Sequence, residues 1–523
     1  MEANRAPGRG EWLGRVAVMV AGLAACLLHL RILAPDHDNA YLLDVAGRML
    51  SGGRYFHDFM ELNPPLYSIL LFPAHGLSAT GLPLYSAFII WISILITAAA
   101  VAIFGTLKPL IEEGVAARAA ISVGVLAALF VVPAIDFGQR DHVALVLFLP
   151  ALVWQAGRRR GRVTAAGWAM VIAAALGVLI KPYLVLAVAG AYAVRLAEER
   201  DWRLLIEPPV WCFAAIACLY VGLIFLVFPE WFLVAQIAQS AYSAFDGSEW
   251  IGRREVVTAV AIAVLAGANE VFGRQGERRL GRVLAAATAG ALGSYVLQHK
   301  SIEYHFIPAR TLVWLLVGLV ALEGIRWLAA LPLPAGLRRW QAMASRYRVL
   351  LLCLVAVLPF YRLADRTVLD ERRVDDSMRT LVAVLEANRI GPRIAVFGTS
   401  VYPAYPLSLY RESLPAWRFA QPWMIPWIVQ QGRAGRADAP ETVKMSAAMR
   451  RLVIEDFERY KPDAILVDET PEKLFLPKDF DIMAWFRQDP TMAAILDKYQ
   501  RVAVFDDPNE RVHFRRLAVY RRI

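Results

Sequence analysis

Residues 84–106 read LYSAFIIWISILITAAAVAIFGT and contain no Asp, Glu, Lys or Arg. About 20 mainly apolar residues in a helix are enough to cross the hydrocarbon core of a bilayer. Backbone polar groups in lipid must find hydrogen-bond partners within the protein, so the segment is expected to be helical. The chain therefore contains at least one membrane span.

Apolar runs of this kind recur through most of the sequence. The chain is 58% hydrophobic and 20% charged, which is more apolar than a soluble protein of ordinary composition. Residues 66–80 are apolar but short, and the sequence leaves open whether they span the membrane, re-enter it or lie on its surface. We predict about eleven spans, near 12–33, 84–106, 117–134, 142–156, 164–180, 183–197, 209–228, 255–272, 283–298, 307–328 and 348–363.

Arginine clusters in short loops predict the sidedness of the chain, because Lys and Arg favour the cytoplasmic side. Counting spans places three clusters and the basic N-terminus together in the cytoplasm. The net charge of +10 is thus explained by topology, and nucleic-acid binding is disfavoured. The clusters are Arg158–Arg162, Arg274–Arg282 and Arg338–Arg348, and the opposite side receives 34–65, 135–141, 181–182, 229–254, 298–306 and the tail.

The N-terminus could also be a cleaved signal segment, since Leu23–Cys26 resembles a lipoprotein cleavage box. The apolar run continues to Leu33, however, which favours a retained first span. All four cysteines lie inside apolar runs, and none has zinc-ligand spacing. A disulfide framework is therefore not expected.

The sequence changes character after residue 363. Charges become frequent, and short β-rich runs alternate with amphipathic stretches, which predicts an α/β domain with a partly parallel sheet. We therefore divide the chain into a membrane domain, 1–363, which includes the first outer loop 34–65, and a C-terminal domain, 364–523. The expected strands are 393–397, 464–467 and 502–505, and the expected helices are 373–388, 440–460 and 482–499.

Two features of the tail resemble ligand-binding sequences. Gly398-Thr399-Ser400 follows a predicted strand but lacks the glycine spacing of a nucleotide loop, so it is interpreted as a turn. Residues 402–427 are rich in Tyr and Trp. Such rings could stack on a sugar or lie at the membrane interface, and the interface is favoured.

The first outer segment carries the most chemistry. Asp36 and Asp38 open a predicted amphipathic helix that Gly52-Gly53 ends, and Asp58 and Glu61 precede the return to the bilayer at Pro64-Pro65. Taken alone, Asp38 fits an N-cap, whose carboxylate accepts hydrogen bonds from the first free amides. Asp36 alone fits a solvated loop acid.

Three further groups of ionisable residues lie at the predicted outer membrane edge. They are Gln139-Arg140-Asp141-His142, Lys181, and residues 298–305 with Lys300 and His305. Ion pairing or snorkelling would also explain such residues, but charges this close to lipid usually face a cavity or one another. Because cations are unusual on this side, we expect Arg140, Lys181, Lys300 and His305 to bind a phosphate.

This mixture of acids and bases suits a lipid-linked phosphosugar. Cations would stabilise the charge of a departing phosphate, and a carboxylate would take the proton of an attacking hydroxyl. Gln139, Asp141 and His142, with Asp58 and Glu61, are the expected substrate-binding residues.

The stretch 36–66 resembles the first outer loop of the GT-C glycosyltransferases. The features are Asp-x-Asp after the first span, then an Ala–Gly-Gly–Tyr run, an acid, and Pro64-Pro65-Leu66. The likeness is to the bacterial branch that resembles protein O-mannosyltransferases and lipid A aminoarabinose transferases. The resemblance implies a polytopic helical membrane protein with a C-terminal α/β domain.

The resemblance also implies roles for particular residues. Asp38, or Asp36, matches the first-loop acid that acts as base or positions the acceptor. Many relatives have Lys where this chain has Asn63, and Arg54, Lys181 or Lys300 are candidates to replace it. Some GT-C members use a divalent metal, for which Asp36, Asp38 and His142 are the candidates here; no cofactor is certain.

The leading functional hypothesis is a membrane glycosyltransferase that uses a polyprenyl-phosphate sugar donor; the resemblance implies an inverting type. Its acceptor would be a glycan, lipid or protein outside a bacterial inner membrane, with the N-terminus cytoplasmic and the tail periplasmic. A lipid-sugar flippase or transporter and a non-catalytic scaffold are the alternatives. The sequence does not name the sugar, the acceptor, the polyprenol length or the oligomeric state.

Overall fold

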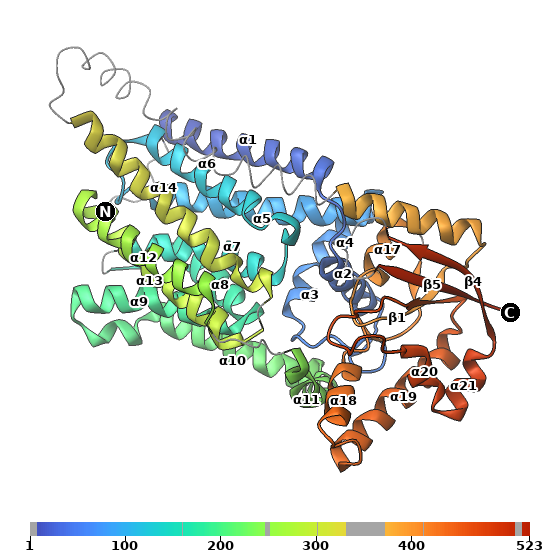
Figure 1. The fold of residues 1–523 in the computed structure, drawn as a ribbon. Coiled ribbons are helices and arrows are strands. Elements are labelled where there is room, and N and C mark those ends of the chain that lie inside the picture. Colours follow the sequence, from blue (N-terminus) through green and yellow to red (C-terminus); the bar gives the residue numbers. More distant parts are fainter. Residues whose placement is uncertain are drawn as a thin grey trace. The chain divides into compact units, whose positions relative to one another are not determined.

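The fold is described from a computed structural model covering residues 8–158, 161–245, 251–300, 302–330, 372–411, 413–507 and 515–523. Contacts divide the chain into two compact units, which are described separately (Figure 1). The helical unit contains 1–31, 89–221 and 247–368. The α/β unit contains 32–88, 222–246 and 369–523, so the first outer loop groups with the tail.

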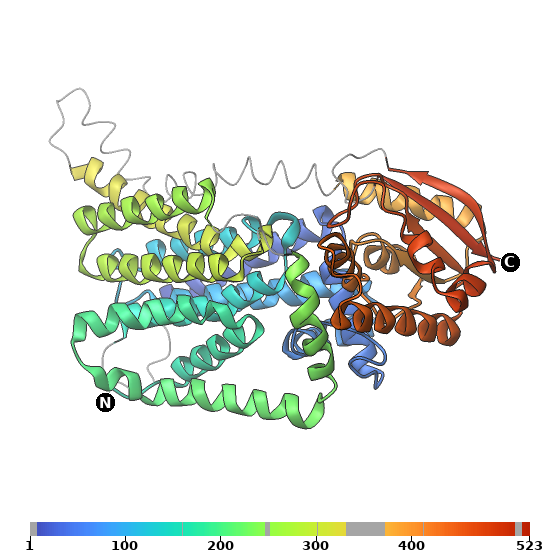
Figure 2. The same cartoon turned by 60° about the horizontal axis from the view of Figure 1, so that its bottom comes forward.

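The helices of the helical unit lie side by side as a bundle (Figures 1 and 2). Ten of the predicted spans fall on described residues and all ten are helical; the eleventh, 348–363, lies outside those residues. The bundle contains α1 (Arg9–Ile32), α5 (Leu84–Thr106), α6 (Val115–Val131), α7 (Arg140–Gly157), α8 (Ala165–Ile180), α9 (Val185–Glu199), α10 (Pro208–Val227), α12 (Arg253–Phe272), α13 (Gln275–Gln298) and α14 (Ile307–Ala330), with the 3₁₀ turns η1 (Ala134–Asp136), η2 (Pro182–Leu184), η3 (Trp202–Ile206) and η5 (Glu303–Phe306).

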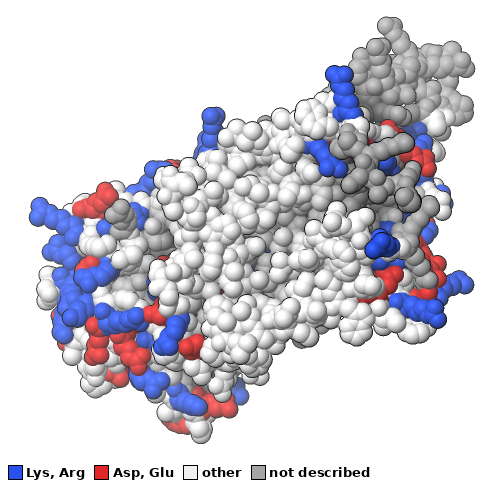
Figure 3. All heavy atoms as spheres, turned by 180° about the vertical axis from the view of Figure 1, so that it is seen from behind, with Lys and Arg blue, Asp and Glu red and all other residues white. Residues whose placement is uncertain are grey.

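The chain is a multi-pass membrane protein. Among the described residues, six helical segments are long and apolar enough to cross a bilayer. Large apolar side chains on α10 and α12, including Leu219, Leu226 and Val264, are exposed to the surroundings. Figure 3 shows a broad surface of the helical unit without Lys, Arg, Asp or Glu, as expected of a surface that faces lipid.

Glycines bring α9 and α13 close together. A Cβ added to Gly290 would lie 2.2 Å from the carbonyl oxygen of Leu186, and one added to Gly190 would lie 2.6 Å from that of Ala286. Small residues at such crossings let helix backbones approach within a membrane. Ser294 adds a hydrogen bond of 2.5 Å to the carbonyl of Tyr183 in η2. The start of α9 is therefore fixed against α13.

The α/β unit begins with the segment 34–65, which the sequence predicts to be the first outer loop. The amphipathic helix expected there is α2 (His37–Leu50), and Gly52 ends it with a φ of +83°, as predicted. Residues 66–80 form two short helices, α3 (Leu66–Leu70) and α4 (Phe72–Ser78). Together they would extend only about 20 Å, which is too short to cross the roughly 30 Å core. α11 (Trp231–Ala241) and η4 (Tyr242–Phe245) complete the part outside the tail.

The tail forms the predicted partly parallel sheet. The strand order is β2-β1-β3-β5-β4, with β2, β1 and β3 parallel and β5 antiparallel to both of its neighbours. The three expected strands are confirmed, and β2 and β5 were not predicted. The strands are β1 (Arg393–Phe397), β2 (Leu414–Pro415), β3 (Ala464–Asp468), β4 (Tyr499–Asp506) and β5 (Arg516–Arg522).

Of the three expected tail helices, those over 373–388 and 440–460 are confirmed. The single helix expected over 482–499 is two helices because Pro490 starts a new one. The helices are 372–387, α17 (Ala404–Tyr410), α18 (Met424–Arg433), α19 (Pro440–Tyr460), α20 (Ile482–Arg487) and α21 (Pro490–Leu496). α17 and α18 were not predicted.

The aromatic stretch 402–427 is part of the core, so both the interface and the sugar-stacking interpretations were wrong. Tyr405, Trp417 and Trp423 are almost fully buried. The ring of Trp417 lies 5.9 Å from that of Phe397 on β1. Large rings are rich in buried area, and here they fill the space between the sheet and its helices.

Candidate active site

Three ionisable side chains from distant parts of the sequence meet inside the helical unit. Asp141 begins α7, Lys181 follows α8, and His305 lies in η5 before α14. Asp141 Oδ2 lies 3.3 Å from Lys181 Nζ and 3.1 Å from His305 Nδ1. Lys181 Nζ lies 3.2 Å from the same ring nitrogen. We call Asp141, Lys181 and His305 the triad.

The position of one proton decides how the triad is bonded. With a proton on Nδ1, His305 donates to Asp141; without it, Nδ1 accepts from Lys181. Only His305 can change its role in this way, because the ammonium of Lys181 only donates and the ionised carboxylate of Asp141 only accepts.

The triad is buried. Asp141 has no exposed surface, and Lys181 and His305 are 7% and 5% exposed. Burying charges costs several kcal/mol per ion unless they are paired and hydrogen-bonded. The second carboxylate oxygen, Oδ1 of Asp141, is buried and has no hydrogen-bond partner in the described part of the chain. The hydrogen-bonding capacity of this oxygen is therefore unused among the described residues.

Three other residues predicted for the site flank Asp141 in the sequence. Gln139, Arg140 and His142 are all buried at the start of α7. The ring of His142 accepts a hydrogen bond of 2.9 Å at Nδ1 from the amide of Gly138. Lys300 is half-buried after α13, and it is not part of the triad.

Arg254 is a polar residue of this region that sequence analysis missed. Its guanidinium donates to Glu303 at 2.7 Å and to the hydroxyl of Tyr295. It also lies 4.8 Å from the centre of the Phe306 ring. Arg254 thus holds residues on both sides of His305. It is a cation at a predicted outer span edge, the same signal that marked Lys181.

Asp36 and Asp38 stand at the start of α2 in the α/β unit. Asp36, not Asp38, is the N-cap: its Oδ1 accepts from the amide of Asn39 at 3.0 Å. The cap assigned to Asp38 was wrong by two residues, since Asp38 lies in the first turn of the helix. His37 contacts both acids, at 3.2 Å from Asp36 and 3.7 Å from Asp38.

Asp58 and Glu61 are engaged within the α/β unit. Asp58 accepts from the Arg54 amide at 2.8 Å and pairs with Arg459 of α19 at 2.6 Å. Glu61 accepts from the amide of Asn63 at 2.8 Å. Both acids thus contribute to the structure of the loop. Their role in substrate binding stays a prediction. Arg54, a candidate to replace the missing lysine, lies 3.6 Å from Glu230.

The metal candidates are divided between the units. Asp36 and Asp38 belong to the α/β unit and His142 to the helical unit. Across the described ranges, no group of three or more His, Cys, Asp or Glu side chains is arranged to hold a metal ion.

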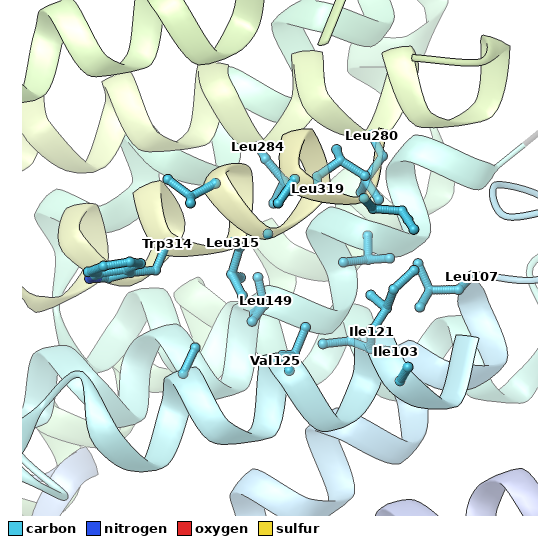
Figure 4. A pocket seen from close by; sticks show the side chains of 18 residues that line it. Ile103, Leu107, Ile121, Val125, Leu149, Leu280, Leu284, Trp314, Leu315 and Leu319 are labelled. Atoms are coloured by element: carbon cyan, nitrogen blue, oxygen red, sulfur yellow. The ribbon is translucent and has the colours of Figure 1, made fainter. Parts of the chain in front are cut away.

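An apolar cavity of about 120 Å³ lies between helices of the helical unit (Figure 4). Its walls come from α5, α6, α7, α13 and α14 and include Val125, Leu149, Leu284 and Trp314. All of its lining residues are apolar or glycine. The cavity is smaller than the usual site of a drug-sized ligand, and it holds no group for chemistry.

A solved structure has an architecture similar to that of this chain. The crystal structure of ArnT from Cupriavidus metallidurans bound to undecaprenyl phosphate is similar, with a TM-score of 0.51 at 15% sequence identity over 97% of each chain. The likeness runs through the membrane helices and the tail alike. This chain has a GT-C fold.

A second similar structure is that of the arabinofuranosyltransferase AftD from Mycobacteria. It has a TM-score of 0.45 at 18% identity, over 97% of this chain and 40% of that one, and nothing is inferred from it. No family model and no curated protein sequence matches the chain. The GT-C fold is thus recognised here from structure and from the first-loop pattern, which agree.

Proposed function

We propose that this chain is a membrane glycosyltransferase that moves a sugar from a polyprenyl-phosphate donor to an acceptor of the cell envelope. The observation that carries the proposal is the triad: a buried acid and two basic side chains that three helix ends bring together. A multi-pass GT-C fold that gathers such groups suits a donor with a lipid tail and a phosphate.

The donor class is supported by the fold neighbour. ArnT was crystallised with undecaprenyl phosphate, and this chain shares its fold along nearly its whole length. Lys181 and His305, with Arg140 and Lys300, are the residues assigned to the donor phosphate. A Lys or protonated His would stabilise the negative charge that grows on the leaving phosphate.

The transfer step is assigned to the first loop. Asp38, or Asp36, takes the proton of the acceptor hydroxyl as the new glycosidic bond forms and the bond to phosphate breaks. Attack from the opposite face would invert the anomeric carbon. Asp141, whose buried Oδ1 has no hydrogen-bond partner among the described residues, is assigned to a hydroxyl of a substrate. The reaction would occur at the outer face of a bacterial inner membrane.

The test is a transfer assay with purified protein, radiolabelled polyprenyl-phosphate sugars and a membrane extract as acceptor. Label is expected to move from lipid to acceptor with the wild type and not with Asp38→Asn. If the donor crosses vesicle membranes and no label is transferred, the chain is a flippase and the proposal fails.

A further inference from the structure

Arginine side chains tie the first outer loop to the tail within the α/β unit. Arg48, in the last turn of α2, donates to the carbonyl oxygens of Pro415 at 3.2 Å and Trp417 at 3.4 Å. The same guanidinium donates to the carbonyl of Asp58 at 2.7 Å and pairs with Asp44 at 2.7 Å. One side chain thus joins α2, the loop after it and the strand β2.

Arg418 of the tail makes further contacts with the first outer loop. Arg418, just after β2, is buried and bonds Asp456 of α19 at 2.9 Å. It also donates to the carbonyl of Phe56 at 3.1 Å, while its own carbonyl accepts from the amide of Met60 at 2.7 Å. Phe56 has a φ of +65°, so these bonds hold a turn that an L-residue adopts only when its surroundings fix it.

The chemistry of these contacts favours arginine. A guanidinium presents five donors in a planar fork, so it can satisfy several carbonyls and a carboxylate together. Pro415 and Trp417 lie 367 and 369 positions from Arg48 in the chain. The pair with Asp44 stabilises α2 itself, and the bonds to these two carbonyls fix where α2 lies on the tail.

We propose that Arg48 is a positioning residue for sugar transfer, which fixes α2 on the tail and thereby the place of Asp38. The inference rests on the proposed function. Arg48 and Asp38 lie ten residues apart on one helix, a distance of about 15 Å. Because a short helix moves as a rigid body, freeing one end displaces the other.

The middle of α2 is held by packing, since Tyr41, Leu43 and Val45 are all buried. The Tyr41 ring lies 4.7 Å from the ring of Tyr405 on α17. His75 of α4 bonds the carbonyl of Leu43 at 2.9 Å. Both contacts lie nearer the middle of α2, and the bonds of Arg48 fix its C-terminal end. A displacement of about 1 Å at a catalytic group can lower a rate by as much as 10²-fold.

The experiment compares transfer kinetics and amide hydrogen exchange in four variants. Arg48→Ala is expected to lower kcat at least tenfold, with KM for the donor changed less than twofold, and to speed exchange of the 52–60 amides. Arg48→Lys keeps the pair with Asp44 and is expected to recover part of the loss. Arg459→Ala removes an exposed tie to Asp58, which the fold tolerates, and is expected to lower kcat two- to threefold.

Arg501→Ala is the matched control, because Arg501 pairs with Glu469 of the tail and has no described contact with the first loop. It is expected to change neither kcat nor exchange. Faster exchange in Arg48→Ala with an unchanged kcat overturns the positioning role and leaves the glycosyltransferase proposal standing. A wild type that transfers no sugar overturns both, and exchange then shows only whether Arg48 holds the loop.

Discussion

Asp141 and Lys181 form an ion pair of 3.3 Å in the interior of the helical unit, although forty positions separate them in the sequence. The pair forms because α7 begins where α8 ends, and His305 closes the group from a third segment. A buried pair of this kind adds little stability relative to apolar residues of the same size. We interpret the pair as part of the proposed donor-phosphate site, and the alternative is that it serves folding alone.

Removal of one partner separates these explanations. Asp141→Ala leaves Lys181 buried without its carboxylate, and a loss of about 3–5 kcal/mol in the free energy of unfolding is expected. The double variant Asp141→Leu, Lys181→Met should recover most of that loss, because it removes both charges. Thermal unfolding in detergent measures the stability.

Activity should not recover with stability. Sugar transfer is expected to be absent in both variants, since the single variant loses the carboxylate that holds Lys181 in place and the double variant loses Lys181 itself. A stable double variant that still transfers sugar would show that the triad is only structural.

Asp36 and Asp38 can be separated because only Asp36 caps α2. Asp36→Ser keeps an oxygen for the Asn39 amide, so α2 should lose less than about 1 kcal/mol of stability. If Asp38 is the base, Asp36→Ser retains transfer and Asp38→Asn abolishes it. Measuring both in the assay with labelled donor assigns the base, and the reverse pattern would give that role to Asp36.

The sequence predicted local structure well because local patterns determine it. Apolar runs set the ten described spans, and Gly52 set the end of α2. The α/β tail followed from strands that alternate with helices. β5 was missed because charged Arg516, Arg521 and Arg522 flank its short apolar centre, and the split at Pro490 was missed because the apolar pattern continues through it.

The sequence predicted individual candidate residues of the site but not how they are grouped. Asp141, Lys181 and His305 were recognised because ionisable groups at a membrane edge are costly. Their grouping was not, since it depends on how helix ends meet. The bonds of Arg48 to the Pro415 and Trp417 carbonyls leave no trace in either segment, because any residue supplies a carbonyl.

The contact between the first loop and α19 should depend on pH. Burial acts to raise the pKa of Asp58, but hydrogen bonds from Arg54 and Arg459 lower it below its ordinary value of 3.8. A carboxyl with a lowered pKa contributes its full stability above the unfolded pKa and loses it as pH falls through the folded one. The contact is therefore expected to be constant above about pH 5 and to weaken below about pH 4.

Amide exchange of residues 52–60, corrected for intrinsic rates, measures this contact. Both side chains are partly exposed, so the difference between wild type and Arg459→Ala should correspond to about 0.2–1 kcal/mol. The difference should vanish in acid. A difference that persists well below the pKa of Asp58 would mean that Arg459 acts through the His57 carbonyl, 3.2 Å away.

The crossing of α9 and α13 links packing to the triad. Lys181 precedes η2 and α9, and His305 follows α13, so the distance between these helices affects the distance between the two side chains. A methyl group at Gly290 would meet the Leu186 carbonyl at 2.2 Å. The backbone of Leu186 cannot move aside as a flexible side chain could. Gly290→Ala is therefore expected to destabilise the protein by about 1–3 kcal/mol.

Gly293→Ala provides the control on the same helix, because its methyl group would meet only the Leu186 Cδ1 atom at 3.7 Å. It should unfold at the same temperature as the wild type or slightly above it, since Ala favours a helix. Gly290→Ala should also lose transfer activity at temperatures where it remains folded, because a wider crossing moves Lys181 away from His305. Equal activity in the two variants would show that the triad tolerates the shift, and that the close approach of α9 and α13 serves stability alone.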